Sequence, residues 1–240
     1  MSLLLILEPL REGGGISIMI KNHINYEKYD IINNMQCNYI EKLAVKITDT
    51  NCKVFLLISC YRPPGPKFKD SMIELNKILD AADRSGLPVI LTGDINVDTL
   101  SSDNFSKEYF DLLQKFHLFQ HIREPTRIST QKKSLIDHVV TNSLMKSVKA
   151  NVVCYTVADH LPTLTLWKHR KEVINENNYD TFTRINYKKL KKLMILIIQI
   201  VRRLSMNYTL MYVVVLHNQP IKCQKGTVPN NHGFVRIQLI

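Results

Sequence analysis

Residues 87–96 have the sequence Leu87-Pro88-Val89-Ile90-Leu91-Thr92-Gly93-Asp94-Ile95-Asn96, and the fold prediction starts from them. The apolar run predicts a strand that is buried on both faces, with Pro88 at its start because proline cannot donate to a strand ladder. Gly93 lets the backbone turn, and Asp94 and Asn96 point the same way in an extended segment. Two interpretations are open: an Asx-rich turn after a core strand, or an acid and an amide delivered to an active-site edge.

The flanking segments predict a mixed domain of strands and helices. Ser71 and Glu74 have the spacing of a helix capping box, a stripe of apolar residues follows at helical spacing, and Gly86 ends it. A second helix is predicted over residues 106–116. Strands are predicted over 16–21, 43–47, 54–61, 134–140, 151–156 and 161–167, with 43–47 and 54–61 forming a hairpin.

The positive charge is concentrated at the C-terminal end. The chain of 240 residues has a net charge of +11, but residues 168–240 hold 13 of 32 Lys and Arg and 3 of 21 Asp and Glu, a net charge of +10. A uniformly basic, nucleic-acid-binding body is therefore excluded for residues 1–167. We predict a domain over 1–167 and a basic, partly helical linker or tail over 168–240, which either binds a polyanion or is solvated.

Cysteines and apolar runs narrow the class of protein further. None of the five cysteines forms a Cys-x-x-Cys pair, which argues against a disulfide framework or a structural zinc site and favours an intracellular compartment. The apolar runs at 3–7 and 193–201 are well short of the roughly 20 residues that cross a bilayer. We therefore expect no membrane partner.

Polar side chains lie at the ends of four predicted strands, in the order Tyr61, Asp94 with Asn96, Asp137, and Asp159 with His160. Each lies within or after an apolar run, so all can reach one edge of a sheet. Carboxylates bind hard divalent cations such as Mg²⁺ or Mn²⁺. The cation and a histidine can neutralise charge on a phosphate, and a carboxylate can orient or deprotonate water. The set suits a metal-dependent phosphodiesterase.

Five short motifs also occur in a fixed order along the chain. They are Gly-Gly-Gly at 13–15, Tyr-Arg-Pro-Pro at 61–64, Gly-Asp-Ile-Asn at 93–96, Pro-Thr-Arg with Ser-Leu-Ile-Asp-His at 125–138, and Ala-Asp-His-Leu-Pro at 158–162. This order resembles the endonuclease/exonuclease/phosphatase superfamily, and more narrowly the endonuclease domain of non-LTR retrotransposons of the LINE or jockey kind. The resemblance covers about residues 11–167 and implies an α+β fold, a two-sheet sandwich flanked by helices.

The resemblance implies roles for the residues nearest the phosphate. Asp94 would align or activate the attacking water, Asn96 would donate a hydrogen bond to a phosphate oxygen, and Tyr61 would contact the phosphate. Arg62 and Arg127 would contact the nucleic-acid backbone; a surface salt bridge is the alternative for either arginine.

The resemblance also implies a metal site and a supported histidine. Asp159 and Asp94 would hold the metal ion. His160 would stabilise the charged phosphate, and Asp137 would orient His160, because a neighbouring carboxylate fixes the tautomer of a histidine. His138 would point to the opposite face of its strand and is predicted to be structural.

The chain departs from the family pattern in two places. The usual Ser-Asp-His is Ala158-Asp159-His160 here, which removes one hydrogen bond worth about 0.5–1.5 kcal/mol. The family's opening strands, which carry an Asn and the principal metal-binding Glu, have no counterpart before Gly13, so that Glu role is assigned to no residue. We therefore expect a sandwich missing its opening strands, an exposed sheet edge and impaired catalysis.

These observations lead to one expected function and two alternatives. The expected function is metal-dependent phosphodiester hydrolysis by a DNA-nicking endonuclease that lies upstream of a reverse transcriptase. Its expected substrate is DNA, and element RNA is a further candidate partner. We expect no small-molecule cofactor and a nuclear location. The first alternative is an inactive remnant that binds nucleic acid weakly through its basic tail. The second is a phosphatase or phosphodiesterase of the same superfamily. The alternatives differ on whether this polypeptide is itself an active enzyme.

Overall fold

The computed structural model describes residues 3–7, 16–21, 24–48, 53–65, 67–145, 148–153, 160–167 and 211–215. Asp159, the Gly-Gly-Gly motif and the helix predicted in the tail lie outside these residues. The domain boundary predicted near residue 168 stays a prediction for the same reason.

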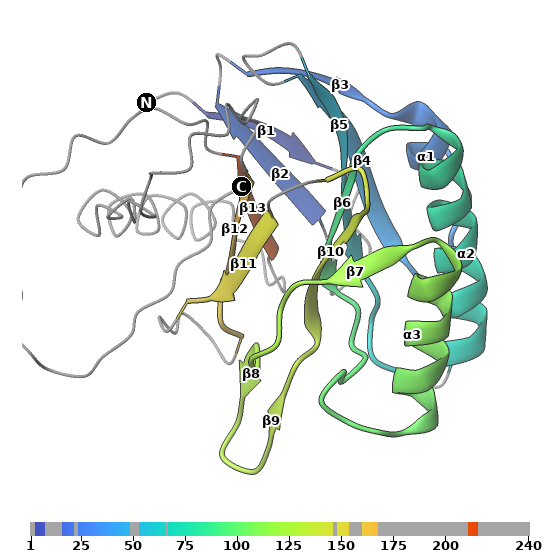
Figure 1. The fold of residues 1–240 in the computed structure, drawn as a ribbon, viewed down its shortest axis with the longest axis vertical. Helices are drawn as coiled ribbons and strands as arrows, with labels where there is room; N and C mark the ends of the chain where they lie inside the picture. The colour runs from blue at the N-terminus through green and yellow to red at the C-terminus, as the bar shows by residue number, and fades with distance from the viewer. Residues whose placement is uncertain are drawn as a thin grey trace, which may run out of the picture. The chain divides into compact units, whose positions relative to one another are not determined.

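A six-stranded sheet forms the centre of the described structure (Figure 1). Its strand order is β3 (Asn25–Lys28), β4 (Glu41–Thr48), β5 (Val54–Tyr61), β6 (Val89–Asp94), β10 (Asp137–Asn142) and β7 (Leu118–Gln120). The β4–β5 pair is antiparallel, which confirms the predicted hairpin, and β6 is buried along its whole length, as its apolar run predicts. Because β5 and β6 are parallel and β10 is antiparallel to β6, the ends of β5 and β6 meet the start of β10.

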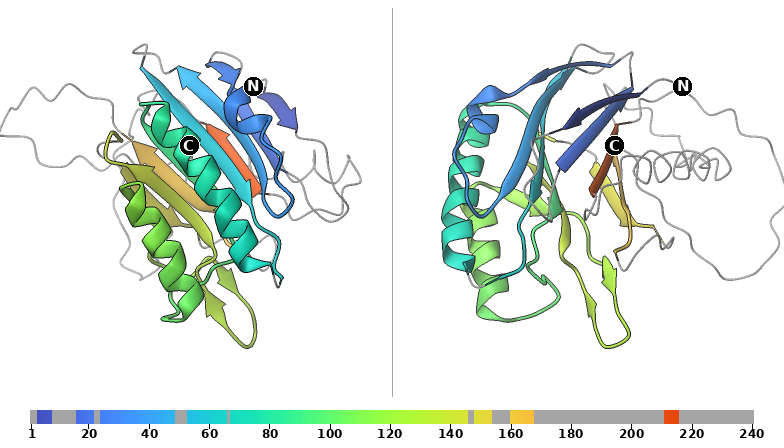
Figure 2. Two further views of the ribbon diagram at one scale, coloured as in Figure 1. Left: turned by 90° about the vertical axis from the view of Figure 1, so that its right-hand side faces the viewer. Right: turned by 180° about the vertical axis from the view of Figure 1, so that it is seen from behind.

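Helices cover one face of this sheet (Figures 1 and 2). They are α1 (Asp30–Asn33), α2 (Phe68–Arg84) and α3 (Asn104–Lys115). The predicted apolar stripe of α2 is buried against the sheet, at Met72, Leu75, Leu79 and Ala82. Gly86 has a φ of +65°, a conformation that suits glycine just past the end of a helix, and the predicted stop is confirmed.

The predicted capping box at the start of α2 is wrong. The helix begins at Phe68, so Ser71 lies within its first turn and donates to the carbonyl of Phe68 at 2.6 Å. The carboxylate of Glu74 instead accepts three backbone N–H groups from a distant loop, those of Asn38, Tyr39 and Ile40. Glu74, which the local pattern assigned to the helix cap, therefore bonds to a loop that is distant in the sequence.

Shorter sheets lie on the other face (Figure 2). They are β1 (Leu3–Leu7), β2 (Ile16–Lys21) and β13 (Met211–Val215) in one sheet, and β11 (Val148–Val152) with β12 (Thr163–Trp167) in another. An apolar layer joins these strands to the six-stranded sheet, with Ile18 of β2, Val152 of β11 and Leu57 of β5 among its buried members. The predicted α+β sandwich is confirmed. Residues 3–7, predicted only as a short apolar run, form a strand paired with β2.

The strand predicted over 134–140 is broken in two. Its first part forms β9 (Lys133–Ser134), which pairs with β8 (Arg127–Ile128) in a hairpin that projects beyond the sheets (Figure 1). The chain then leaves the ladder, because the hydroxyl of Thr126 accepts the N–H groups of Ile136 and Asp137. This break allows β10 to begin at Asp137.

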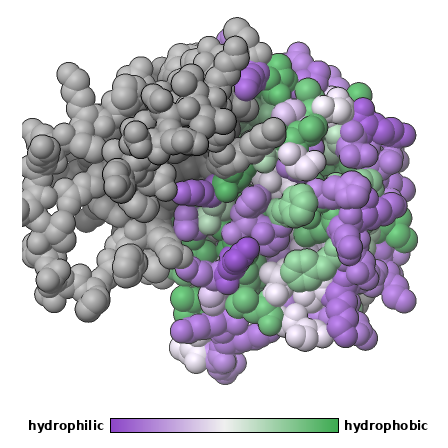
Figure 3. All heavy atoms as spheres, viewed as in Figure 1, coloured by the Kyte–Doolittle hydropathy of each residue, from purple (hydrophilic) through white to green (hydrophobic). Residues whose placement is uncertain are grey.

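The described surface is mostly hydrophilic on the side seen in Figure 3, with apolar residues in separate groups. Exposed large apolar side chains include Ile73 of α2 and Phe105 and Phe110 of α3. Such scattered residues are normal on a surface in contact with water. Among the described helices, none is long and apolar enough to cross a membrane.

Candidate active site

Three predicted site residues lie side by side on adjacent strands. Tyr61 at the end of β5 is opposite Asp94 of β6, and Asp94 is opposite Asp137 of β10. Cross-strand partners share a face of the sheet, and here it is the face that packs against the smaller sheets. The prediction that these residues meet at one edge is therefore confirmed. The row continues to Glu41 of β4, opposite Tyr61, which no motif indicated and only the strand register reveals.

Asp94 has a strongly perturbed carboxyl group. It is only 4% exposed, and its Oδ1 accepts the backbone N–H of Asn96 at 3.0 Å. Burial first, and then the charge of Asp137, raise the pKa of Asp94 to about 7, against the opposing effects of His160, the Asn96 N–H and Arg127. A bound cation would favour the ionised carboxylate, which is the form that can accept a proton from water.

The predicted contact between Asp137 and His160 is present. Nδ1 of His160 lies 3.1 Å and 3.0 Å from the two carboxylate oxygens of Asp137. A carboxylate in this position holds the proton on Nδ1 and stabilises an imidazolium. Nε2 is then the ring nitrogen on the side away from Asp137.

The site offers ligand atoms to a metal ion. Among the described residues, atoms of Asp94, Asp137 and His160 lie within 4.8 Å of one another. Because Nδ1 of His160 is engaged by both carboxylate oxygens of Asp137, His160 could bind such an ion only through Nε2. Asp94 is therefore the best-placed described ligand, and a divalent ion beside it would offset the repulsion between two carboxylates. Asp159, the other predicted ligand, lies outside the described residues.

Asn96 sits in a tight turn directly after β6. Its φ is +52°, a left-handed conformation that asparagine adopts more readily than most residues. Its Nδ2 donates to the carbonyl of Arg62 at 2.9 Å, and one further N–H remains on that nitrogen to serve a phosphate oxygen. The bond from the Asn96 N–H to Asp94 is itself an Asx turn. The Asx-turn interpretation of this sequence is therefore confirmed, and the active-site interpretation stays a prediction that the turn is compatible with.

The two arginines occupy different environments. For Arg62, a contact to the nucleic-acid backbone or a surface salt bridge was predicted, and the surface salt bridge is wrong: Arg62 is 6% exposed and its guanidinium donates to backbone carbonyls. Arg127 is exposed on β8, and its backbone pairs with that of His160 in an isolated antiparallel β-bridge. The positive charge of Arg127 lowers the pKa of Asp94. The phosphate contact predicted for Arg127 stays a prediction in a position that suits it.

Thr126 is a site residue to which no role was assigned from sequence. It is fully buried, and its Oγ1 accepts the N–H groups of Ile136 at 3.1 Å and Asp137 at 3.0 Å. Its carbonyl accepts the N–H of Leu161 at 2.6 Å, directly after His160. One residue thus ties together the segments that carry Asp137 and His160. The Pro-Thr-Arg motif pointed to this position without showing its function.

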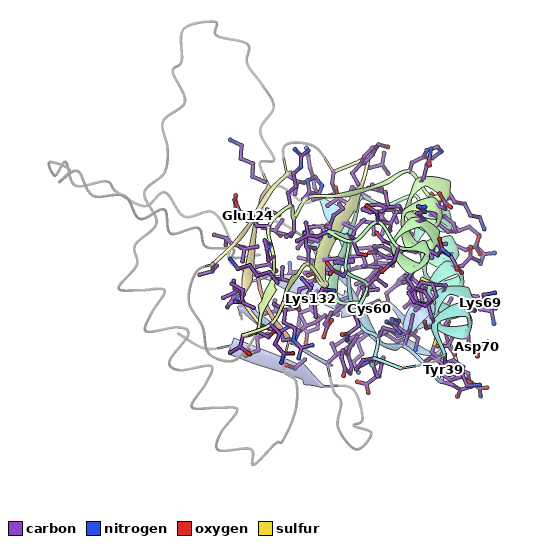
Figure 4. All side chains as sticks on the ribbon, turned by 90° about the horizontal axis from the view of Figure 1, so that it is seen from below. Tyr39, Cys60, Lys69, Asp70, Glu124 and Lys132 are labelled. Atoms are coloured by element: carbon purple, nitrogen blue, oxygen red, sulfur yellow. The ribbon has the colours of Figure 1, made fainter. Side chains whose placement is uncertain are left out.

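The projecting hairpin is fixed to the loop that follows β6. Nζ of Lys132 lies 2.8 Å from Oδ2 of Asp98, whose Oδ1 accepts the N–H of Leu135 at 3.0 Å. Figure 4 shows Lys132 on the side of the domain away from Lys69 and Asp70 of α2. The lysine itself is largely exposed, so this ion pair orients the hairpin more than it adds stability.

His138 is structural, as predicted. It is fully buried, with Nε2 at 3.0 Å from the carbonyl of Val97 and Nδ1 at 2.8 Å from the hydroxyl of Tyr109. Because a carbonyl only accepts, Nε2 carries the proton and Nδ1 accepts from Tyr109. Burial lowers the pKa of His138 to about 4, so the ring is neutral at physiological pH. It links the loop after Asn96 to α3.

This histidine predicts a specific loss of stability in acid. The pKa is about 6.5 in the unfolded chain and about 4 in the folded protein, so the unfolded state binds more protons between these values. The free energy of unfolding should fall as the pH drops from 6.5 towards 4, by about 3 kcal/mol at most. Urea unfolding at several pH values measures this. His138→Gln should flatten the pH dependence in this window; an unchanged slope would contradict the assignment.

Comparison with known proteins agrees with the geometry. A family model described as "Endonuclease-reverse transcriptase" matches residues 55–164. The endonuclease domain of TRAS1, a telomere-specific non-LTR retrotransposon, is 16% identical, with a TM-score of 0.55 over 68% of this chain and 76% of that domain. No curated protein sequence matches this chain significantly.

Two further structures are less similar. The human Nocturnin catalytic domain has a TM-score of 0.45 and 12% identity, over 68% of this chain and 70% of its own. A mannosyl-6-phosphatase of Bacteroides thetaiotaomicron VPI-5482 has a TM-score of 0.39 and 20% identity, over 53% and 57%.

The motifs, the sandwich and the family model matched over residues 55–164 together confirm the resemblance to the endonuclease/exonuclease/phosphatase superfamily. The chain has the fold of the TRAS1 endonuclease domain, and the family model over residues 55–164 agrees with it, which confirms the resemblance to non-LTR retrotransposon endonucleases.

Proposed function

We propose that this protein is a divalent-metal-dependent endonuclease that nicks DNA, with Mg²⁺ or Mn²⁺ as the ion. The observation that carries the proposal is the row of Asp94 and Asp137 at one sheet edge, with His160 bonded to Asp137. A proton acceptor for water and a supported histidine thus lie within a few ångströms of each other. We also propose a nuclear location for the protein, where its substrate would be chromosomal DNA.

In the proposed reaction, Asp94 accepts a proton from a water molecule as its oxygen attacks the phosphorus. The bond to the leaving oxygen breaks as the new phosphorus–oxygen bond forms, and the leaving oxygen takes up a proton from the surrounding water, which leaves a nicked strand. His160, held by Asp137, donates a hydrogen bond from Nε2 to the phosphate, and Asn96 donates from Nδ2. The metal ion, bound through Asp94 and Asp159, would supply a Lewis acid that neutralises charge on the phosphate.

DNA is favoured over a small phosphate ester by the surface beside the site. Arg127 is exposed next to His160, and the same hairpin carries exposed Lys133 and exposed Lys132, the latter in an ion pair with Asp98. Basic side chains spaced along a projecting hairpin can follow a polymer of phosphates, whereas a monoester needs only a closed pocket. Charge on the hairpin is the observation that separates this proposal from the phosphatase alternative.

A comparison of substrate classes tests the proposal. With Mg²⁺, the full chain should convert supercoiled plasmid to the open circular form, and EDTA should stop the conversion. Release of inorganic phosphate from mononucleotides, sugar phosphates and inositol phosphates should be at least about 10²-fold slower, because these esters do not engage the hairpin. A well-folded protein that hydrolyses a monoester and leaves plasmid intact would support the phosphatase alternative instead.

A further inference from the structure

We propose that Arg62 is a positioning residue that holds the Asp94–Asn96 turn in its reactive geometry, rather than a contact to the substrate. The inference rests on the proposed function for its effect on catalysis, but its structural basis is independent of any activity.

The guanidinium of Arg62 is bonded to the turn through two of its nitrogens. Nε donates to the carbonyl of Ile95 at 2.6 Å, and Nη2 donates to the carbonyl of Asn96 at 2.8 Å. The third nitrogen, Nη1, lies 3.3 Å from the carbonyl of Pro63. Hydrogen bonds from a charged donor are stronger than neutral ones, and a planar fork fixes both carbonyls at once.

The backbone of Arg62 completes the attachment. Its N–H donates to the carbonyl of Asp94 at 2.9 Å, and its carbonyl accepts Nδ2 of Asn96 at 2.9 Å. Residue 62 therefore bonds to three consecutive residues, 94, 95 and 96, through main chain and side chain together. This matters most at Asn96, because its left-handed conformation is uncommon for a residue other than glycine, although asparagine adopts it more readily than most, and the bonds to Arg62 help to hold it.

The position of the side chain excludes the substrate role. Arg62 is 6% exposed, and its guanidinium carbon lies 5.5 Å from the ring centre of Phe68, at the start of α2. Burial lowers the pKa of this guanidinium. By contrast, Arg127 is exposed beside His160. The same contact to the nucleic-acid backbone was predicted for both arginines, but one is buried and the other is exposed. Enzyme kinetics can therefore distinguish their roles.

The test compares Arg62→Lys with Arg127→Ala in plasmid nicking. Lysine keeps the charge but cannot bond two carbonyls with a planar fork, so kcat should fall about 10²-fold, the scale expected from a displaced catalytic group. KM for DNA and its dependence on salt should stay within twofold of the wild type. Arg127→Ala should instead raise KM and reduce the slope of log affinity against log salt by about 1. A raised KM and reduced salt slope in Arg62→Lys, with kcat unchanged, would overturn the proposal.

A second measurement decides the matter without activity and without the variant. In the wild-type protein, the Nε–H of a buried, bonded arginine should give an NMR signal whose exchange with water is at least 10-fold slower than that of Arg127. If plasmid is not nicked but the Nε–H signal is protected, the proposed function fails and the positioning role stands. An Arg62 signal that exchanges as fast as that of Arg127 would overturn the positioning role, whatever the nicking result.

Discussion

Replacing Asp94 by Asn should lower the rate of plasmid nicking by about 10²–10⁴-fold, the range for loss of a positioned proton acceptor, and raise the stability of the metal-free protein. The amide can still accept the N–H of Asn96, so the turn should survive. The ionised carboxylate is unfavourable in its buried site beside Asp137, which raises the pKa of Asp94 to about 7. Asparagine removes that unfavourable charge.

The sign of the stability change follows from the raised pKa. The folded protein holds the Asp94 proton more tightly than the unfolded chain, so stability falls as the pH rises from about 4 through 7. In the absence of metal at pH 8, Asp94→Asn should therefore unfold at a higher temperature than the wild type. Mg²⁺ should raise the unfolding temperature of the wild type and have less effect on the variant.

Asp80→Asn on α2 is the matched control, because it makes the same chemical change at a half-exposed residue, paired with Arg84, on the helical side of the sheet. It should leave nicking and the response to Mg²⁺ unchanged. Retained nicking in Asp94→Asn would remove Asp94 from the mechanism, and a lower unfolding temperature would contradict the account of its burial.

Replacing Thr126 by Val should be the most damaging change away from the reacting atoms. Valine has nearly the same shape but cannot accept the N–H groups of Ile136 and Asp137, which would be left unsatisfied. Each unsatisfied buried donor costs about 1–3 kcal/mol, so we expect a loss of about 2–5 kcal/mol in the free energy of unfolding. Because β10 begins at Asp137, nicking should fall as well, by about 10-fold or more where the variant still folds.

Thr126→Ser separates the hydroxyl from the shape of the side chain. Serine keeps Oγ and loses only a methyl group, so it should retain most of the stability and most of the activity. Urea unfolding and plasmid nicking of the two variants measure this. Valine and serine variants of equal stability would show that the hydroxyl is not what holds the start of β10.

The sequence was most informative where chemistry follows a strong local pattern. Tyr61, Asp94 and Asp137 each lie at an end of an apolar strand, and strands of one sheet bring such ends to one edge. The pairing of Asp137 with His160 was accessible through the resemblance to a known family. The hairpin and the stripe of α2 follow from periodicity alone.

The failed predictions involve partners that are distant along the chain. Glu74 has the spacing of a helix cap, but its carboxylate accepts three backbone N–H groups from the loop at residues 38–40 instead. Arg62 follows Tyr61 by one residue, and no local pattern shows that its side chain turns inward to the carbonyls of residues 95 and 96. Glu41 enters the site row only through strand register.

The inactive-remnant alternative also makes a definite prediction. A remnant would bind DNA through its basic residues, lose that binding steeply with salt, and leave the phosphodiester backbone intact. An active endonuclease must also activate a water molecule and break a bond to phosphorus, which an inactive remnant does not do. DNA binding alone therefore does not separate the two accounts, and chemistry at the phosphorus does.

The most direct measurement is a single-turnover nicking reaction in water enriched in ¹⁸O. The purified full chain is mixed in excess with supercoiled plasmid and Mg²⁺, and the phosphate at the nick is analysed by mass spectrometry. The account predicts open circular DNA with one ¹⁸O atom in that phosphate, and no nick with EDTA. A folded protein that makes no nick with Mg²⁺, or nicks equally well with EDTA, would contradict the claim that this site hydrolyses DNA with a metal ion.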